Sequence, residues 1–393
     1  MIRFTLLLAL LTAFPPLSTD MYLPAIPLLQ RLWETPLALI NLTLVLFFVV
    51  YCASLLIYGP LADRFGRKPP LVTGIAIYIL GSLLCALSHS VYLLIAARIF
   101  QALGAASASA VSMAMTKDRL SGKAREKVMG YVSVIMALAP MAAPMIGSLI
   151  LELASWEWIF AGQALLGLVA LTGVLLTPET LDRPTRVPVK ALARNYVTTL
   201  ANKTFMGVTL CTSLTGLPFF AFIGTCSPLY IRQYGLDETT FSLFFGGNAL
   251  TFMAGAMACA RLTQHLKSTT LVSAGALGIT LGGVLMATHP FPGPWSLAIP
   301  MGIISFALGI SRPPANSLAL GQVTQHAGAA SSLLVFIYFI LGALSMGMVS
   351  LLGDYKQPFI AGLAVLSGGI VFFAWRRVVP GLRNPEPPEA EQE

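Results

Sequence analysis

Residues 37–68 read LALINLTLVLFFVVYCASLLIYGPLADRFGRK, and this stretch indicates how the whole chain is built. An apolar run from 37 to 61 leads into a short loop that carries one acidic and three basic side chains. The run is longer than the roughly 20 residues that a helix needs to cross a bilayer. It is continuously apolar and does not alternate with period two, so a strand of a membrane barrel is excluded. The stretch therefore predicts a transmembrane helix followed by a basic loop.

The composition of the other parts of the chain agrees with this pattern. Of the 393 residues, 56% are hydrophobic and 10% are charged, whereas a soluble domain has roughly 25% charged residues. A soluble protein is therefore excluded. The net charge of +8 does not indicate a nucleic-acid partner, because the basic residues lie in short clusters between apolar runs and form no continuous basic face.

Twelve apolar runs of this kind follow one another, and the longest polar stretch lies between the sixth and the seventh. We expect an all-α integral membrane protein with an N-terminal six-helix bundle (1–177), a cytoplasmic linker (178–203), a C-terminal six-helix bundle (204–377) and a disordered tail (378–393), the two bundles being related by pseudo-symmetry. The predicted spans are 4–29, 37–61, 70–88, 91–115, 128–151, 157–177, 204–230, 240–260, 269–288, 296–320, 328–352 and 358–375.

The distribution of Lys and Arg predicts the orientation in the bilayer. The loops that follow spans 2, 4, 6 and 8 contain clusters of basic residues, whereas the loops on the other side contain only Arg31, Arg232 and Lys356. Basic loops remain on the cytoplasmic side of a membrane. Both termini are therefore expected in the cytoplasm.

Asp20 is an acidic residue well inside the first predicted span. A charged group at this depth costs about 2.5 to 3.5 kcal/mol, so such residues usually face a cavity and serve transport. Pro24 has no N–H to donate to the carbonyl of Asp20, so we expect a kink beside the acid. Because burial favours the neutral form of a carboxyl group, Asp20 is predicted to carry a proton. Asp20 and Tyr22 are also candidate substrate contacts, a role that the family resemblance given below implies for Asp20.

The fourth span carries a basic residue at a similar depth. Arg98 and Gln101 fall on one helical face, beside a stripe of small residues that includes Gly104 and permits close helix packing. We expect Arg98 to take part in proton coupling, by holding Asp20 ionised until a proton arrives, or to orient a substrate. Gln101 is expected to contact substrate.

Two further stretches are candidate gates. The loop between the second and third spans contains Gly59, Asp63, Arg64, Gly66 and Arg67, in which glycine permits the turn and Asp63 can pair with Arg67. An ion pair present in only one conformation would bias a two-state equilibrium.

The other candidate gate lies in the fifth span. Pro140 and Pro144 remove helix hydrogen bonds on one side, and with Gly147 they predict a bent, closely packed helix.

Polar residues elsewhere in the spans are candidate substrate contacts. Residues 310–317 read ISRPPANS and interrupt the tenth span with a cation, two prolines and an amide. The candidates in or near span interiors are Asn41, Tyr51, Asn248, Arg312 and Asn316.

The five cysteines lie in apolar stretches, have no C-x-x-C pair and have no His at metal-ligand spacing. We expect them to be reduced packing residues and expect no metal or cofactor. A membrane enzyme is disfavoured because no nucleophile–base pair or buried acid–histidine cluster is visible. A channel is disfavoured because no filter-forming segment is present.

These stretches together resemble the major facilitator superfamily, and within it the Bcr/CflA-type drug:proton antiporters. The loop resembles the G-x-L-a-D-r-x-G-r-k motif, completed by Lys68, and the first span resembles D-m-Y-L-P-a-x-P from Asp20 to Pro27. Arg98, Gln101 and Gly104 match R-x-x-q-x-x-G, and the prolines with Gly147 resemble the antiporter motif of span 5. Some relatives have a second acid two turns earlier, where this chain has Thr12, and Ser148 replaces a glycine.

The resemblance implies a monomeric transporter in a bacterial inner membrane that works by alternating access. It implies export of amphipathic antibiotics, such as phenicols, bicyclomycin or lipophilic cations, in exchange for protons. The proton gradient would be its energy source. A proton-coupled transporter of a small metabolite, such as a nucleoside, is the alternative, because the same scaffold serves symport.

Overall fold

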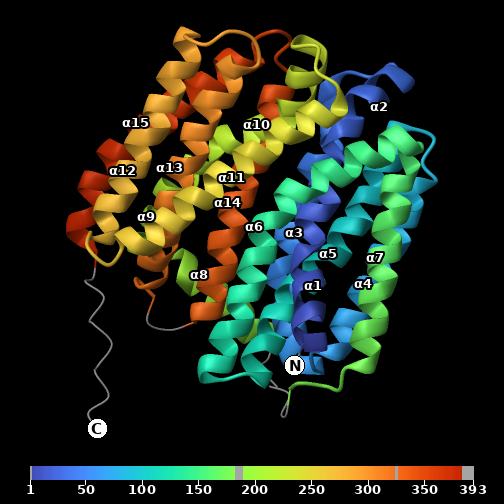
Figure 1. The fold of residues 1–393 in the computed structure, drawn as a ribbon. Helices are drawn as coiled ribbons and strands as arrows, with labels where there is room; N and C mark the ends of the chain where they lie inside the picture. The colour runs from blue at the N-terminus through green and yellow to red at the C-terminus, as the bar shows by residue number, and fades with distance from the viewer. Residues whose placement is uncertain (1, 182–188, 324–325, 383–393) are drawn as a thin grey trace.

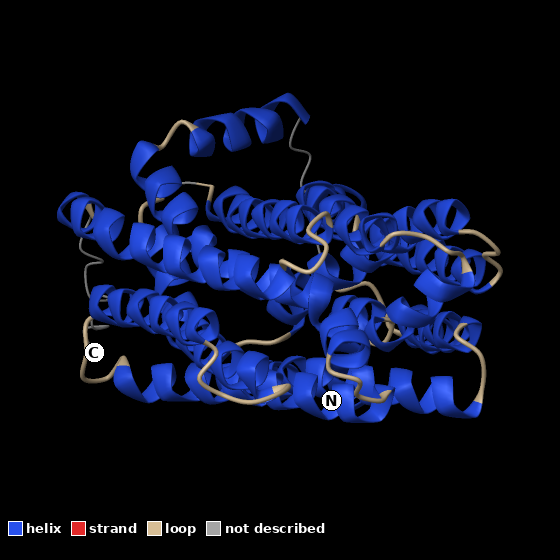
Figure 2. Ribbon diagram, turned by 90° about the horizontal axis from the view of Figure 1, so that it is seen from above, coloured by secondary structure: helices blue, strands red, loops and turns tan. Residues whose placement is uncertain are grey.

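The computed structural model describes residues 2–181, 189–323 and 326–382, and all regular elements within these ranges are helices (Figure 1, Figure 2). Twelve helical segments are long and apolar enough to span a membrane. The prediction of an all-α membrane protein with twelve spans is therefore confirmed. The tail from residue 383 onward and the linker residues 182–188 lie outside the described ranges.

The N-terminal half begins with a helix that is broken before it reaches the end of the span. α1 ends at Asp20, a 3₁₀ turn follows at Leu23–Ala25, and α2 completes the span. The sequence predicted one kinked helix here, and the structure has an interruption of several residues that contains Pro24. The helices of this half are α1 (Ile2–Asp20), α2 (Ile26–Leu32), α3 (Leu37–Phe65), α4 (Lys68–Ala86), α5 (Val91–Arg119), α6 (Gly122–Leu153) and α7 (Glu157–Leu176).

The C-terminal half also begins with a broken span, in which a 3₁₀ turn at Leu214–Gly216 separates two helices and a π-helical turn at Pro228–Gln233 follows. Its last helix continues into a short turn at Val379–Gly381, inside the predicted tail. The helices of this half are α9 (Lys203–Ser213), α10 (Leu217–Ser227), α11 (Glu238–Leu262), α12 (Ser268–Thr288), α13 (Trp295–Leu320), α14 (Ala327–Ser350) and α15 (Lys356–Val378).

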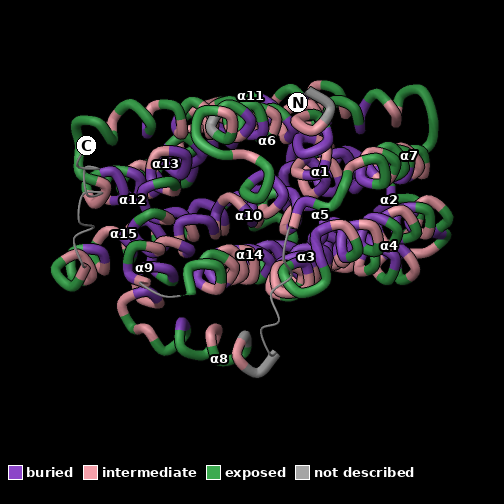
Figure 3. The backbone as a smooth tube through the Cα atoms, turned by 90° about the horizontal axis from the view of Figure 1, so that it is seen from below, coloured by how far each residue is buried: buried purple, intermediate pink, exposed green. Residues whose placement is uncertain are grey.

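One helix was not predicted. α8 (Val189–Leu200) lies in the linker between the halves and runs beside the bundle next to the ends of α3 and α14 (Figure 3). The hydroxyl of Tyr196 donates a hydrogen bond of 2.9 Å to the carbonyl of Leu56 in α3. Part of the linker is therefore an ordered helix that is attached to the N-terminal half.

The two ends of the bundle differ in what they carry. α1 begins and α15 ends at the same end, which is the lower end in Figure 1 and is called the terminal end below. The loop between α3 and α4 and the start of the linker, residues 178–181, also lie there. The opposite end, called the far end, carries α2 and the start of α3.

The outward faces of the peripheral helices are apolar, as a protein surrounded by lipid requires. Large hydrophobic residues of α4, α7, α12 and α15 are exposed. Exposed residues lie on the outer sides of the helices, and residues between the helices are buried (Figure 3). Examples of these exposed side chains are Leu83, Leu165, Leu281 and Phe373.

Candidate functional site

Asp20 is the last residue of α1, at the break in the first span. Its side chain is buried, with 7% of the residue exposed, and its Oδ1 accepts a hydrogen bond of 2.8 Å from the hydroxyl of Thr19. Within the described residues the only ion pairs are those of Arg67, so no cation neutralises this carboxyl group. The break thus places a carboxyl group between helices without a fixed countercharge.

Polar side chains from two neighbouring helices cap the broken end of α1. The last carbonyls of a helix lack partners within it. Here the carbonyl of Ser18 accepts a hydrogen bond of 2.8 Å from Arg98 Nη1, and that of Leu17 accepts one of 3.0 Å from Gln163 Nε2. Gln101 joins the two donors, because its Oε1 accepts from Arg98 and its Nε2 donates to Gln163 Oε1 at 2.7 Å.

Arg98 therefore lies beside Asp20 without pairing with it. Its guanidinium is fully buried and packs over the rings of Phe47, Tyr22 and Phe160, at 4.5, 5.2 and 5.7 Å from their centroids. A positive charge at the C-terminal end of α1 is favoured by the helix dipole. The geometry makes Arg98 a fixed cap of the helix that ends in Asp20.

Tyr22, a candidate substrate contact, is also enclosed within the N-terminal half. It has no exposed surface, its hydroxyl accepts a hydrogen bond of 3.3 Å from Thr43, and its ring packs on Phe160.

The bent helix α6 packs directly on the break in α1. A Cβ atom at Gly147 would lie 2.1 Å from the carbonyl oxygen of Met21, so only glycine permits this approach. Pro140 and Pro144 lie inside α6, and the Pro144 carbonyl accepts a hydrogen bond of 3.0 Å from Ser242 of α11. α6 thus contacts both the residue after Asp20 and the C-terminal half.

The direct hydrogen bonds between the two halves that the structure describes lie toward the far end. Asn41 Nδ2 donates to the carbonyl of Gly224 and to the hydroxyl of Ser350, each at 2.6 Å. Arg232 donates to the carbonyl of Pro27 at 3.4 Å. Asn41 was predicted as a substrate contact, and the structure places it in this contact between the halves.

Aromatic rings fill the interface between the two halves on the side of Asn41 that faces the terminal end. Tyr51 stacks against Phe47 at 6.2 Å and meets the edge of Phe339 of α14 at 5.7 Å. Phe48 contacts Phe339 at 5.4 Å and Phe220 of α10 at 5.5 Å. Phe48, Tyr51, Phe220 and Phe339, called the aromatic cluster below, form a surface that both halves contribute to.

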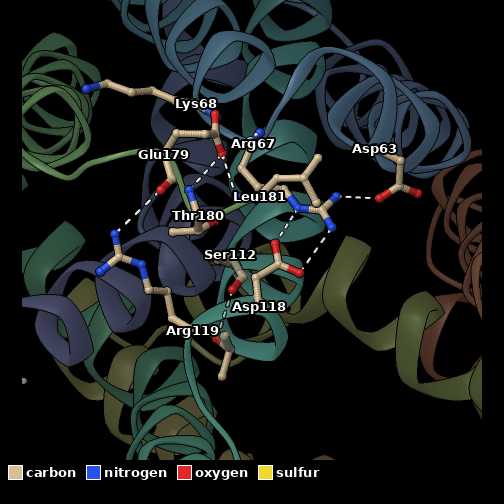
Figure 4. A network of polar contacts seen from close by, with 10 residues as sticks. Asp63, Arg67, Lys68, Ser112, Asp118, Arg119, Glu179, Thr180 and Leu181 are labelled. Carbon is tan, nitrogen blue, oxygen red and sulfur yellow. Dashed lines mark hydrogen bonds and ion pairs between the residues drawn. The ribbon is translucent and has the colours of Figure 1, made fainter. Parts of the chain in front are cut away.

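The loop between α3 and α4 is held by Arg67 at the terminal end (Figure 4). Its guanidinium pairs with Asp63 one turn earlier and with both oxygens of Asp118 at the end of α5, at 2.7 and 3.3 Å. Burial acts to lower the pKa of Arg67, but the two carboxylates outweigh it and raise that pKa above its ordinary value. The predicted pair between Asp63 and Arg67 is present, and Asp118 extends it to α5.

Glu179, which belongs to the linker, binds the backbone of the same loop (Figure 4). Its carboxylate accepts hydrogen bonds from the backbone N–H groups of Arg67 and Lys68 at 3.0 Å each, and from those of Thr180 and Leu181 at 2.7 and 3.0 Å. Partial burial acts to raise the pKa of Glu179, but these four donors lower it below its ordinary value. The linker is thereby attached to the start of α4.

The remaining loop residues have simpler positions. Gly66 has φ +93°, a left-handed conformation in which its missing Cβ leaves room for Glu179. The guanidinium of Arg64 lies over the ring of Phe65 at 5.3 Å. A Cβ at Gly59 would have nothing within 4 Å, so close packing gives no reason for a glycine at that position.

The candidate substrate contacts of the C-terminal half lie in two separate places. Asn248 accepts a hydrogen bond of 2.9 Å from Ser305 and borders a cavity of about 700 Å³ between α11 and α13, lined almost wholly by apolar side chains. Arg312 and Asn316 border a much smaller hollow with Tyr338 of α14. The guanidinium of Arg312 lies 3.1 Å from the centroid of that ring.

Sequence reasoning missed Gln163, Asp118 and Glu179. Gln163 could have been found, since it is an amide inside an otherwise apolar span. Asp118 and Glu179 gave no such signal, because acidic residues at helix ends and in loops are common, and only the folded structure brings them to the loop. Within the described residues, no group of three His, Cys, Asp or Glu side chains could hold a metal.

Comparison with known proteins agrees with this architecture, because the model of the Major Facilitator Superfamily matches residues 8–346. The chain belongs to this superfamily of transporters. It is 29% identical to the bicyclomycin resistance protein homolog of Haemophilus influenzae, over 94% of this chain and 93% of that one. It is also 29% identical to a chloramphenicol resistance protein of Pseudomonas aeruginosa, over 88% of this chain and 82% of that one.

The fold is shared with solved structures of low sequence similarity. A bacterial homolog of the human lysosomal transporter Spinster, in an inward-facing and occupied conformation, has a TM-score of 0.77 at 15% identity and covers 98% of each chain. The predicted superfamily and fold are therefore confirmed.

Proposed function

We propose that this transporter exports amphipathic drugs such as phenicols or bicyclomycin-like antibiotics in exchange for protons. Its relatives include proteins named for bicyclomycin and chloramphenicol resistance. The observation that carries the proposal is the position of Asp20. Among the described residues it is the one carboxylate more than two helical turns from either end of a membrane span, and it has no cationic partner.

The contacts around Asp20 suggest how a proton and a cargo are exchanged. Asp20 ends the helix that Arg98 and Gln163 hold from one side and on which α6 packs through Gly147 from the other. A rocking motion of the halves moves the helices of the C-terminal half, such as α10, relative to this point. Exchange requires that bound proton and bound cargo weaken each other, which is a reciprocal coupling free energy.

We propose that the terminal end faces the cytoplasm of a bacterial cell and that the monomer is the working unit in its inner membrane. The described loop at that end carries Arg64, Arg67 and Lys68, as the cytoplasmic loops of membrane proteins do. The far end, where Asn41 and Arg232 join the halves, then faces the exterior. The described conformation is closed on the outside in this orientation.

One proton per cycle follows from one carboxyl group, and it has an electrical consequence. Exchange of a proton for a neutral drug moves one positive charge, so the membrane potential contributes about 2.3 kcal/mol per 100 mV. The pH gradient contributes about 1.4 kcal/mol per pH unit. Exchange for a monovalent cation would use the pH gradient alone.

The test uses purified protein in lipid vesicles with an acidic interior and labelled chloramphenicol outside. The unaltered protein should accumulate the drug, and Asp20→Asn should abolish accumulation while exchange of labelled for unlabelled drug continues. Asp237→Asn is the control, because Asp237 is an exposed acid that caps α11 and asparagine caps a helix equally well. Accumulation by Asp20→Asn at the rate of the unaltered protein would contradict the proposal.

A potassium diffusion potential tests the charge movement in the same vesicles. An inside-positive potential should increase accumulation of this neutral drug, by up to about 50-fold per 100 mV at equilibrium, because each cycle carries one positive charge out. Accumulation that ignored the potential would refute exchange of one proton for one neutral molecule.

A further inference from the structure

Arg312 is a charged side chain in the membrane interior for which the fold supplies no counterion. It lies in α13, eight residues before Leu320, so its Cα is about 12 Å from the end of that helix. Among the residues that the structure describes, no carboxylate pairs with it. Its one recorded partner is the ring of Tyr338. An arginine at this depth is costly and usually faces a pathway.

The side chains around the guanidinium supply hydrogen-bond donors. Asn316 lies one helical turn beyond Arg312, and Thr212 and Ser213 approach from the end of α9. The hydroxyl of Thr212 is occupied, since it donates to the carbonyl of Val208 at 2.8 Å. No hydrogen bond is recorded for the side chains of Arg312 or Asn316 within the described part of the chain. A guanidinium has donors and no acceptor. The donors of Arg312 therefore lack an acceptor among the described residues around this hollow.

The size of the hollow limits what can enter it. Its volume is about 10 Å³, which is room for roughly one water-sized group. One functional group of a larger molecule fits there, but a whole drug does not. The planar fork of arginine matches the two oxygens of a carboxylate. The hollow therefore admits one oxygen of a carboxylate beside Arg312.

The rest of such a molecule would meet aromatic rings next to the hollow. Most of these rings are buried where the halves meet in the described conformation, so a cargo reaches them when the halves separate there. The ring of Tyr338 lies 5.1 Å from Phe220 and 5.8 Å from Phe339, both members of the aromatic cluster. Phe48 of the N-terminal half completes this surface. A ring stacked on the cluster with its carboxylate on Arg312 would contact both halves at once.

We propose that Arg312 and Asn316 form a subsite that binds the carboxylate of an amphipathic cargo whose aromatic part packs on the aromatic cluster. This inference rests on the proposed function, because it defines a cargo class for the same transporter. It extends that class to molecules with a carboxylate, zwitterionic ones included. The negative charge is recognised in the C-terminal half, and the proton is bound in the N-terminal half at Asp20.

The experiment measures binding of two dyes that differ only in this group, rhodamine B, which has a free carboxylate, and its ethyl ester. Fluorescence polarisation gives the Kd of each for the purified protein in lipid nanodiscs. Arg312→Gln should weaken binding of rhodamine B by about tenfold or more, as expected for loss of a hydrogen bond to a charged group, and that of the ester by less than about twofold. Asn316→Ala should have a smaller effect in the same direction.

Arg376→Gln is the matched control, because Arg376 also lies over an aromatic ring, that of Phe372 at 4.6 Å, but in the last turn of α15. It should leave both Kd values unchanged. Equal weakening of the two dyes by Arg312→Gln, or no weakening of either, would overturn the inference. So would failure of the unaltered protein to bind rhodamine B.

Failure of the proposed function would have a different signature. In that case accumulation of the ester, which does not need the carboxylate subsite, would survive Asp20→Asn or removal of the pH gradient. An acid-to-ester ratio that Arg312→Gln leaves unchanged, in a protein whose transport still needs Asp20, would refute the subsite alone.

Discussion

Arg98 and Arg312 are arginines inside membrane spans of two related bundles, yet they have different positions and surroundings. Arg98 lies near the start of α5 at the far end, whereas Arg312 lies closer to the end of α13 at the terminal end. Arg98 donates to the carbonyl of Ser18 and to Gln101 and is enclosed by three rings. Arg312 contacts one ring and a small hollow. The difference shows that the role of an arginine inside a span depends on whether a ligand can reach it. Nη1 of Arg98 donates within the protein, and aromatic rings cover the guanidinium, whose buried Nε and Nη2 have no recorded partner in the described part of the chain. Arg312 instead borders a hollow.

The largest expected effect separates the two arginines by stability. Arg98→Leu should lower the free energy of unfolding by about 3 kcal/mol, because it leaves the carbonyl of Ser18 and Oε1 of Gln101 without their donor. Arg312→Leu should change it by less than about 0.5 kcal/mol or increase it, because no hydrogen bond is lost. Thermal unfolding in one detergent, followed by the fluorescence of the native tryptophans, measures both.

Arg98→Lys sharpens this comparison, because lysine keeps the charge but lacks the planar guanidinium that packs over the rings of Phe47, Tyr22 and Phe160. It should recover part of the stability and little of the transport. Equal destabilisation by Arg98→Leu and Arg312→Leu would remove the distinction between the two arginines.

The next effect tests the other contact that holds the break in α1. Gly147→Ala places a Cβ where the carbonyl oxygen of Met21 lies 2.1 Å away, and overpacking of this kind costs about 1 to 3 kcal/mol. Gly130→Ala is the control in the same helix, since nothing lies within 4 Å of its Cβ. Unfolding temperatures and proton-driven transport should fall for the first variant and not for the second. Equal tolerance of both would mean that α6 does not press on the break.

Asn41 differs from both arginines, because its side chain donates hydrogen bonds to residues of the other half. Asn41→Ala should shift the equilibrium toward the form that is open at the far end by roughly threefold to twentyfold, since a hydrogen bond in a membrane protein contributes about 0.6 to 1.7 kcal/mol. Distances between spin labels on the two halves at the far end measure this shift.

Thr43→Val is the matched control for Asn41, because Thr43 lies on the same helix but bonds only to Tyr22 and Ile40 of its own half. It should leave the label distances unchanged. A shift of equal size in both variants would assign the effect to α3 itself.

The sequence predicted the fold well for a physical reason. Continuous apolar runs leave only helices as a solution in lipid, so twelve spans could be counted from the sequence. Asp20, Arg98 and Arg312 were also found, because ionisable groups are conspicuous in such runs. Their partners could not be predicted, since the approach of Gln163 to Leu17 or of Ser350 to Asn41 depends on how distant helices pack.

The smallest expected effect concerns Glu179. Its substitution tests whether an exposed charged side chain can hold the backbone at a helix end, as Arg98 does in the buried interior. Its carboxylate accepts from four backbone N–H groups, two of them at the start of α4. Glu179→Gln should increase hydrogen exchange of the Arg67 and Lys68 amides about threefold at pH 7, because a neutral amide is a weaker acceptor than a carboxylate at a helix N-terminus. Mass spectrometry of the peptides that contain the loop measures the rate.

The pH dependence of this effect has a definite sign. The four donors hold the pKa of Glu179 below its ordinary value in the folded protein, so its contribution is fully present above the ordinary carboxyl pKa. It is lost as the pH falls through the lowered pKa, and the difference between Glu179→Gln and the unaltered protein should vanish only there. Glu152→Gln, at an exposed position near the end of α6, should show no difference at any pH. A difference for Glu179→Gln that persisted below that pKa would mean that side-chain shape, and not the negative charge, holds the loop.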